Sequence, residues 1–142
     1  MEKHEEIKRM EFTNITAGMK NEAKETVTEK NTAAVMGSGS LPVYATPAMT
    51  CLMEKAAAEL LEKELPEGWT SVGISLQIQH KAATPLGGKV RAEAELIEAD
   101  GRRFVFQVRA FDDLEEIGCG QHERFAVVKE KFLSKAAAKK GK

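Results

Sequence analysis

The sequence TPAMTCLME, residues 46–54, predicts the start of the one long helix in a chain that is otherwise rich in strand patterns. Thr46 is suited to cap that helix, and Pro47 is suited to its first turn, where the missing N–H costs nothing. Apolar side chains then recur every three or four residues to about Lys63 and form a single face, made of Met49, Leu52, Met53, Ala56, Ala57 and Leu60. That face needs a sheet to cover it.

Extended segments lie on both sides of the helix. Residues 22–29 alternate small or apolar side chains with charged ones, which is typical of an edge strand with one face in water. In the segment 71–80, His80 shares the apolar phase of Val72, Ile74, Leu76 and Ile78. Three more strands follow, the first two joined by the hairpin signal Asp100-Gly101, at residues 90–96, 103–111 and 117–128.

One strand, a long helix and four strands in hairpin succession predict an α+β chain of the hot-dog type, in which a five-stranded antiparallel sheet wraps around one helix. At 142 residues the chain is long enough for one domain, which we place at residues 12–132, between a flexible N-terminal segment (1–11) and a basic C-terminal tail (133–142). Open sheet edges in so small a unit are commonly closed by a second copy. We therefore expect a homodimer.

Composition argues against several classes of function. The formal net charge of −1 provides no overall field that would attract nucleic acid. No apolar run approaches the roughly 18 residues of a membrane span and the N-terminus is polar, so we expect a soluble cytoplasmic protein without a membrane partner. Cys51 and Cys119 lack CxxC spacing and the three histidines lack ligand spacing, which argues against a disulfide framework, a metal site or a cofactor.

His80 is the first candidate for chemistry, because an imidazole on the apolar side of a strand must find a hydrogen-bond partner or lose its hydration without compensation. It is either a satisfied core residue or a functional histidine. Thr46 also has two interpretations. It is a helix cap alone, or it is a hydroxyl beside the free N–H groups and positive dipole of a helix N-terminus, a suitable place for an oxyanion.

Glu54 lies beside the apolar stripe of the helix, where a carboxylate is either an ion-pair partner, for Lys55 or Lys81, or a buried acid with a function. Eight residues of helix rise about 12 Å and turn by roughly 80°, so Glu54 does not reach the hydroxyl of Thr46 on its own helix. If both serve one site with His80, either His80 bridges them or one group comes from a partner chain. This reasoning predicts a site at a dimer interface.

Glycines interrupt two of the predicted strands. Gly73 is either a bulge or a place where a ligand approaches the backbone, and the segment Gly118-Cys119-Gly120 has the same two interpretations. Arg124 is either a solvated cation or a group that binds a phosphate or carboxylate. His122, which shares its phase, and His4 are interpreted as surface residues.

Taken together, these motifs resemble the fluoroacetyl-CoA thioesterase-like family of hot-dog proteins over about residues 22–132. The resemblance is carried by Glu54, by His80, and by the segments VYATPAM (43–49), SVG (71–73), AATPLG (82–87), ADGR (99–102) and GCGQHER (118–124). It implies a catalytic set of Thr46, Glu54 and His80, with Gly73 and Arg124 near the acyl end of the site. The implied reaction is hydrolysis of a short-chain acyl-CoA thioester to the free acid and CoA, which is part of the substrate and not a cofactor.

Several points stay open at the level of sequence. Thr46 attacks the thioester with His80 as base, or Glu54 and His80 activate water. Residues 37–40 are GSGS, whereas the fluoroacetyl-specific member of the family carries bulky aromatic residues there, which favours a different short acyl group. The alternative function is a non-catalytic protein that binds acyl-CoA or a CoA metabolite. Four residues are candidates to contact the CoA phosphates because of their positive charge alone, namely Lys81, Lys89, Arg91 and Arg109.

Overall fold

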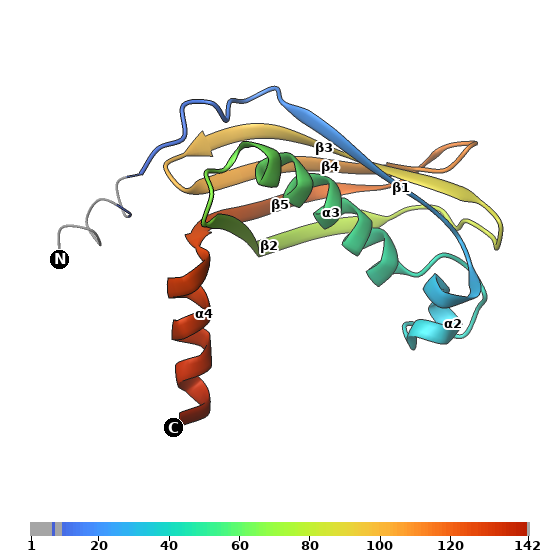
Figure 1. Ribbon diagram of the computed structural model, residues 1–142. Coiled ribbons are helices and arrows are strands. Elements are labelled where there is room, and N and C mark those ends of the chain that lie inside the picture. The colour runs from blue at the N-terminus through green and yellow to red at the C-terminus, as the bar shows by residue number, and fades with distance from the viewer. Residues whose placement is uncertain (1–6, 8–9, 142) are drawn as a thin grey trace.

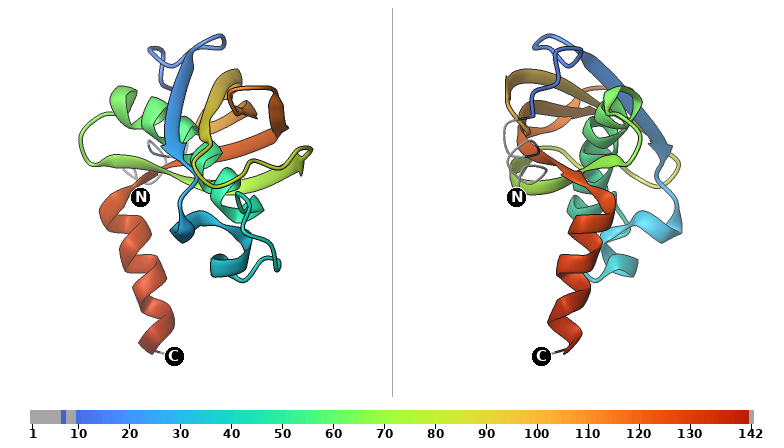
Figure 2. Two further views of the ribbon diagram at one scale, coloured as in Figure 1. Left: turned by 90° about the vertical axis from the view of Figure 1, so that its right-hand side faces the viewer. Right: turned by 60° about the vertical axis from the view of Figure 1, so that its left-hand side comes forward.

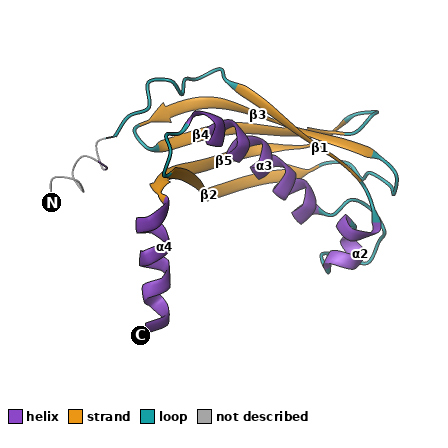
Figure 3. Cartoon of the chain, in the orientation of Figure 1, coloured by secondary structure: helices purple, strands orange, loops and turns teal. Residues whose placement is uncertain are grey.

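The computed structural model describes residue 7 and residues 10–141, so His4 and most of the predicted flexible segment 1–11 lie outside the described residues. The main elements are one long helix, α3, and five strands, with bounds β1 Lys20–Thr26, α3 Thr46–Glu64, β2 Trp69–His80, β3 Lys89–Asp100, β4 Arg103–Phe111 and β5 Glu116–Val128 (Figures 1 and 3). Four short helical elements accompany them, η1 Glu29–Asn31, α2 Ala33–Met36, α4 Lys129–Ala137 and η2 Ala138–Gly141.

The five strands form one antiparallel sheet in the order β1-β3-β4-β5-β2. The sheet curls around α3, as the views in Figures 1 and 2 show, so the predicted hot-dog architecture is confirmed. The hairpin between β3 and β4 is also confirmed, because Asp100 pairs with Arg103 and Gly101 takes a φ of +60°. β1 and β2 are the two outer strands, and each leaves one edge unpaired among the residues that the structure describes.

α3 presents its apolar face to the sheet and forms the centre of the core. All six residues of the predicted stripe are buried, and Ala48 and Leu61 extend it. The predicted cap is wrong, because Ala45 occupies the N-cap position without a side-chain hydrogen bond and Thr46 is the first helical residue. The Thr46 hydroxyl is therefore available to another partner.

A β-bulge near the start of β2 determines which side chains face the helix. Gly73 pairs with Arg124 and Ser75 pairs with Glu123, so Ile74 is the extra residue. A bulge adds one residue and reverses the alternation of faces. The prediction that Ile74 points into the core is wrong, since it is 53% exposed. The bulge interpretation of Gly73 is confirmed, and it brings Gly73 to the same side of the sheet as His80.

The glycines of β5 serve close packing. A Cβ added at Gly118 would lie 2.6 Å from the Met49 sulfur, and one added at Gly120 would overlap the carbonyl oxygen of Gln77. β5 therefore approaches both α3 and β2 more closely than a strand with side chains at these positions allows. At its end the chain continues into α4, which projects away from the sheet (Figures 1 and 2). Among the described residues, no helix combines the length and the apolar content that crossing a bilayer takes.

Candidate active site

Thr46 and His80 meet where the start of α3 approaches the end of β2. The Thr46 Oγ1 and the His80 Nδ1 are 2.8 Å apart, which is a hydrogen bond. The approach depends on the segment before the helix, where the Tyr44 N–H donates to the carbonyl oxygen of Thr84. This pairing ties the entry of α3 to the loop that follows β2, so a hydroxyl and an imidazole from distant parts of the chain face one another.

The His80 ring is half-buried, and its second nitrogen has a different environment. Nε2 is buried and has no hydrogen-bond partner among the residues that the structure describes. Burial lowers the pKa of His80 below its usual value, and a backbone hydrogen bond with Ala82 partly opposes that effect. A neutral ring with its proton on Nε2 accepts the Thr46 hydroxyl hydrogen at Nδ1, which is the arrangement of a general base beside a nucleophile.

A hollow of about 280 Å³ opens beside this pair, lined by Ala33, Ser38, Val43, Tyr44, Thr46, His80, Lys81, Ala82 and Ala83. The side chains of Ala33 and Ser38 are small, in keeping with the GSGS segment. Lys81 is the one charged residue among these lining residues, and its ammonium group forms an ion pair with Glu116. The hollow is therefore lined largely by small side chains, with one cation among them.

Glu54 lies in a second cluster and not beside Thr46 and His80. Its Oε2 is 3.8 Å from the Arg124 Nη1, so its cationic neighbour is Arg124 and not Lys55 or Lys81, the two partners named in the ion-pair interpretation; at 42% exposure within one chain, the side chain is not a buried acid either. A Cβ added at Gly73 would lie only 2.9 Å from that carboxylate oxygen. The five predicted site residues thus form two groups within one chain. Thr46 and His80 make the first, and Glu54, Gly73 and Arg124 make the second.

Arg124 and His122 are both buried, so the interpretation of His122 as a surface residue is wrong. Arg124 is 7% exposed and His122 is 1% exposed. The Arg124 Nε donates to the Ser71 Oγ at 2.8 Å and its Nη2 donates to the Ser71 carbonyl at 3.1 Å. The Arg124 Nη1 is 3.1 Å from the His122 Nε2. The sequence shows that the two residues share a phase of the strand. Polar side chains that alternate in this way usually indicate a solvent-exposed face, so their burial could not be predicted.

Comparison with known proteins adds an independent finding. The model of the family described as fluoroacetyl-CoA-specific thioesterase matches residues 27–130. The chain belongs to this family. Membership in the fluoroacetyl-CoA-specific thioesterase family confirms both the resemblance in the sequence motifs and the expected class of enzyme, a thioester hydrolase.

Three relatives illustrate the similarity. A fluoroacetyl-CoA thioesterase of Streptantibioticus cattleyicolor is 41% identical over 97 residues, which is 68% of this chain and 70% of the relative. The crystal structure of the fluoroacetyl-CoA thioesterase FlK has a TM-score of 0.83 at 33% identity, over 88% of this chain and 97% of its own. A hot-dog-like protein from Thermanaerovibrio acidaminovorans has a TM-score of 0.84 at 25% identity, over 92% of this chain and 97% of its own.

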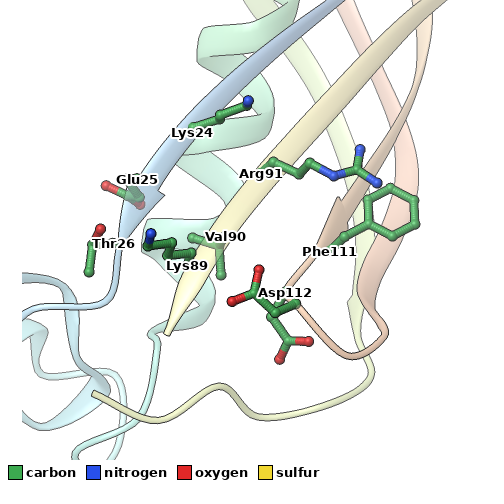
Figure 4. Close-up of a pocket in the computed structure, with 9 residues that line it drawn as sticks. Lys24, Glu25, Thr26, Lys89, Val90, Arg91, Phe111 and Asp112 are labelled. Carbon is green, nitrogen blue, oxygen red and sulfur yellow. The ribbon is translucent and has the colours of Figure 1, made fainter. Parts of the chain in front are cut away.

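A second hollow in this thioesterase, of about 310 Å³, lies at the ends of β1, β3 and β4 (Figure 4). Lys89 and Arg91 line it together with Asp112 and Asp113, so both cations and acids surround it. Arg91 also pairs with Glu93 and lies 4.3 Å from the centre of the Phe111 ring. It shares no lining residue with the Thr46–His80 hollow, so two of the four phosphate candidates line a different hollow, although the Tyr44 hydroxyl donates to the Glu25 carboxylate between the two. In the described part of the chain, no cluster of His, Cys, Asp or Glu is suited to a metal ion.

Proposed function

We propose that this thioesterase hydrolyses a short-chain acyl-CoA to the free acid and CoA, using Thr46, His80 and Glu54 at the interface of a homodimer. The observation that carries the proposal is the 2.8 Å contact between the Thr46 hydroxyl and a half-buried His80 whose other nitrogen lacks a partner among the described residues. A point mutant of FlK has been crystallised with fluoroacetate and CoA, which supports an acyl-CoA as the substrate class here.

The dimer that we propose forms through the unpaired edge of β2. Antiparallel pairing of two β2 strands, with the two-fold axis near Gln77, runs Gly73 of one copy toward His80 of the other, because the bulge at Ile74 adds one residue. Glu54 and Arg124 lie against Gly73, so they accompany it to the second copy. In this assembly the Glu54 carboxylate of one copy accepts the Nε2 hydrogen of His80 in the other. Each active site then consists of both groups of residues.

The chemistry follows the order of these contacts. The Thr46 Oγ1 attacks the thioester carbonyl carbon while its proton moves to the His80 Nδ1, and the Glu54 carboxylate stabilises the imidazolium. The first-turn N–H groups and the dipole of α3 stabilise the oxyanion. The C–S bond then breaks, CoA leaves as the thiol with the proton from His80, and water hydrolyses the acyl–Thr46 ester. The net reaction consumes one water and yields one acid and one thiol.

Gly73 and Arg124 are proposed to bind the acyl end of the substrate. Gly73 lacks a side chain that would fill the space beside Glu54, and the buried Arg124 guanidinium offers a fixed positive charge to a polarised acyl group. Ala33 and Ser38 in the wall of the hollow beside Thr46 leave room that bulky aromatic side chains would occupy. We therefore propose a short acyl group other than fluoroacetyl as the preferred substrate.

Release of free CoA from a panel of short acyl-CoA thioesters tests the proposed reaction. We expect turnover of at least one member of the panel, with fluoroacetyl-CoA among the poorer substrates. The measurement is the rate of thiol release at saturating substrate, accompanied by the thermal shift that each CoA ester produces. Thermal stabilisation without thiol release across the whole panel would instead show a protein that binds CoA esters without cleaving them.

The proposed base predicts the pH dependence of the reaction. His80 must be neutral to accept the Thr46 proton, and its pKa lies below the 6.5 of an unperturbed histidine because the ring is partly buried. Lowering the pH protonates the ring, so kcat/KM is expected to fall on the acidic side as the pH passes through the pKa of His80. Initial rates measured from acidic to neutral pH, with circular dichroism at each point, separate loss of the base from unfolding. A rate that stays constant as the pH falls, while circular dichroism shows a folded protein, would contradict this assignment.

A further inference from the structure

His122 is the buried titratable group that the reaction above does not use. Its Nδ1 lies 2.9 Å from the carbonyl oxygen of Ser75, and its Nε2 lies 3.1 Å from the Arg124 Nη1. A carbonyl oxygen only accepts and a guanidinium only donates hydrogen bonds. Both contacts are therefore satisfied by one form of the ring, neutral, with its proton on Nδ1 and its lone pair on Nε2.

This ring is one of three acceptors that hold the Arg124 guanidinium. Ser71 takes the hydrogens of Nε and Nη2, and His122 takes one from Nη1. The Glu54 carboxylate is the nearest anion, yet it stays 3.8 Å away from Nη1 and makes no hydrogen bond to it. Without an acceptor at His122, the buried Nη1 hydrogen gains most by turning toward Glu54, since an unpaired buried donor is costly.

We propose that His122 is a positioning residue, which fixes the Arg124 guanidinium as a neutral hydrogen-bond acceptor and thereby leaves the Glu54 carboxylate free for His80 of the other copy. The inference rests on the proposed function of Glu54 and Arg124. In this proposal two residues of the segment QHER have different roles. Arg124 binds the acyl end of the substrate, and His122 fixes the Arg124 guanidinium through a hydrogen bond.

The surroundings of the ring favour the neutral form. Burial lowers the pKa of His122, and the positive charge of Arg124 on the same strand acts in the same direction. Three groups act in the opposite direction and raise the pKa of His122, namely the Ser75 carbonyl on β2, Glu54 on α3 and Glu123 on β5. The ring of Phe106 on β4, with its centre 6.5 Å from that of His122, closes the remaining side without a charge.

Two isosteric substitutions separate the two hydrogen bonds. In His122→Asn the amide nitrogen replaces Nδ1 and keeps the Ser75 bond, but no acceptor faces Arg124. In His122→Gln the amide oxygen replaces Nε2 and keeps the Arg124 bond, but Ser75 loses its donor. We expect kcat/KM for the acyl-CoA substrate to fall about 10- to 100-fold in His122→Asn and to change only a few fold in His122→Gln.

A purely structural role predicts equal losses of activity in the two variants, because each variant loses one buried hydrogen bond. Equal losses would overturn the inference. In a Glu54→Gln background the difference between Asn and Gln is expected to disappear, since Arg124 no longer has a carboxylate to capture. If Glu54→Gln and Arg124→Gln alone retain wild-type rates, the proposed function of these residues fails, and that result is distinct from equal effects at His122.

The wild-type protein provides a second test that needs no variant. Two-dimensional NMR of the histidine ring nitrogens reports which nitrogen carries the proton. We expect His122 to be neutral and protonated at Nδ1 at pH 7, and to remain so when substrate analogue is bound. A ring protonated at Nε2, or on both nitrogens, is incompatible with an acceptor for Arg124 and would overturn the inference.

Discussion

Replacing His80 by alanine is expected to lower kcat for acyl-CoA hydrolysis by about 10³-fold, within the usual contribution of a positioned general base. The substitution removes the acceptor that lies 2.8 Å from the Thr46 Oγ1, so the hydroxyl loses the group that takes its proton. KM is expected to change little, because the imidazole is used in the transition state more than in binding. The measurement is the rate of CoA release at saturating substrate.

Matched variants make the result specific. Gln79→Ala removes an exposed side chain from the neighbouring position of the same strand and is expected to keep the wild-type rate. Thr46→Ser retains the hydroxyl and is expected to retain most of the activity, whereas Thr46→Ala is expected to lose about as much as His80→Ala. Near-wild-type rates in both alanine variants would remove the proposed catalytic pair. Loss in His80→Ala with full activity in Thr46→Ala would leave direct activation of water as the mechanism.

Much of the fold was predictable because its patterns are long and local. The stripe on α3 repeats over about three turns, and every predicted member is buried. The Asp100-Gly101 hairpin was predictable for a different reason, since only a few residue types accept the φ that a two-residue turn requires. Hydrophobic alternation placed the strands of the sheet in the correct sequence segments. The predicted succession of hairpins is correct for β3, β4 and β5 and wrong for β2, which pairs with β5 and not with β3.

The bulge in β2 was the point at which alternation failed. Val72, Ile74, Leu76 and Ile78 look like one continuous phase, and only Gly73 signals an irregularity. Alternation carries no information about an inserted residue, because the pattern on either side of a bulge is regular. The consequence for the site is large. Without the extra residue at Ile74, Gly73 and His80 would point to opposite sides of the sheet.

The same limit explains Thr46 and His122. A threonine before a proline-led helix matches a cap by its local sequence, and only the fold shows that its hydroxyl meets an imidazole 34 residues away. His122 looked exposed because its neighbour on the same phase is an arginine. The buried side chains of His122 and Arg124 are stabilised by a hydrogen bond between them and by Ser71, which lies 53 residues away from Arg124. Long-range polar partners of this kind leave no periodic signal in the sequence.

Purified heterodimers of two inactive variants are expected to regain about half of the wild-type rate per dimer, if each site combines residues of both copies. One subunit carries His80→Ala and the other carries Glu54→Gln. In the proposed assembly one of the two sites then receives His80 from the second subunit and Glu54 from the first, and it is intact. Each homodimer has two damaged sites, so the two parents are expected to be slower by about 10²- to 10³-fold.

The reciprocal heterodimer gives the opposite expectation and serves as the control. Here one subunit is wild type and the other carries both substitutions, so every site that spans two copies contains one damaged group. We expect this heterodimer to be nearly inactive, although it holds the same four side chains as the first one. A site built within a single chain would reverse both outcomes. The two heterodimers, separated with different affinity tags and assayed for CoA release, therefore decide whether Glu54 reaches His80 across β2 or from its own chain.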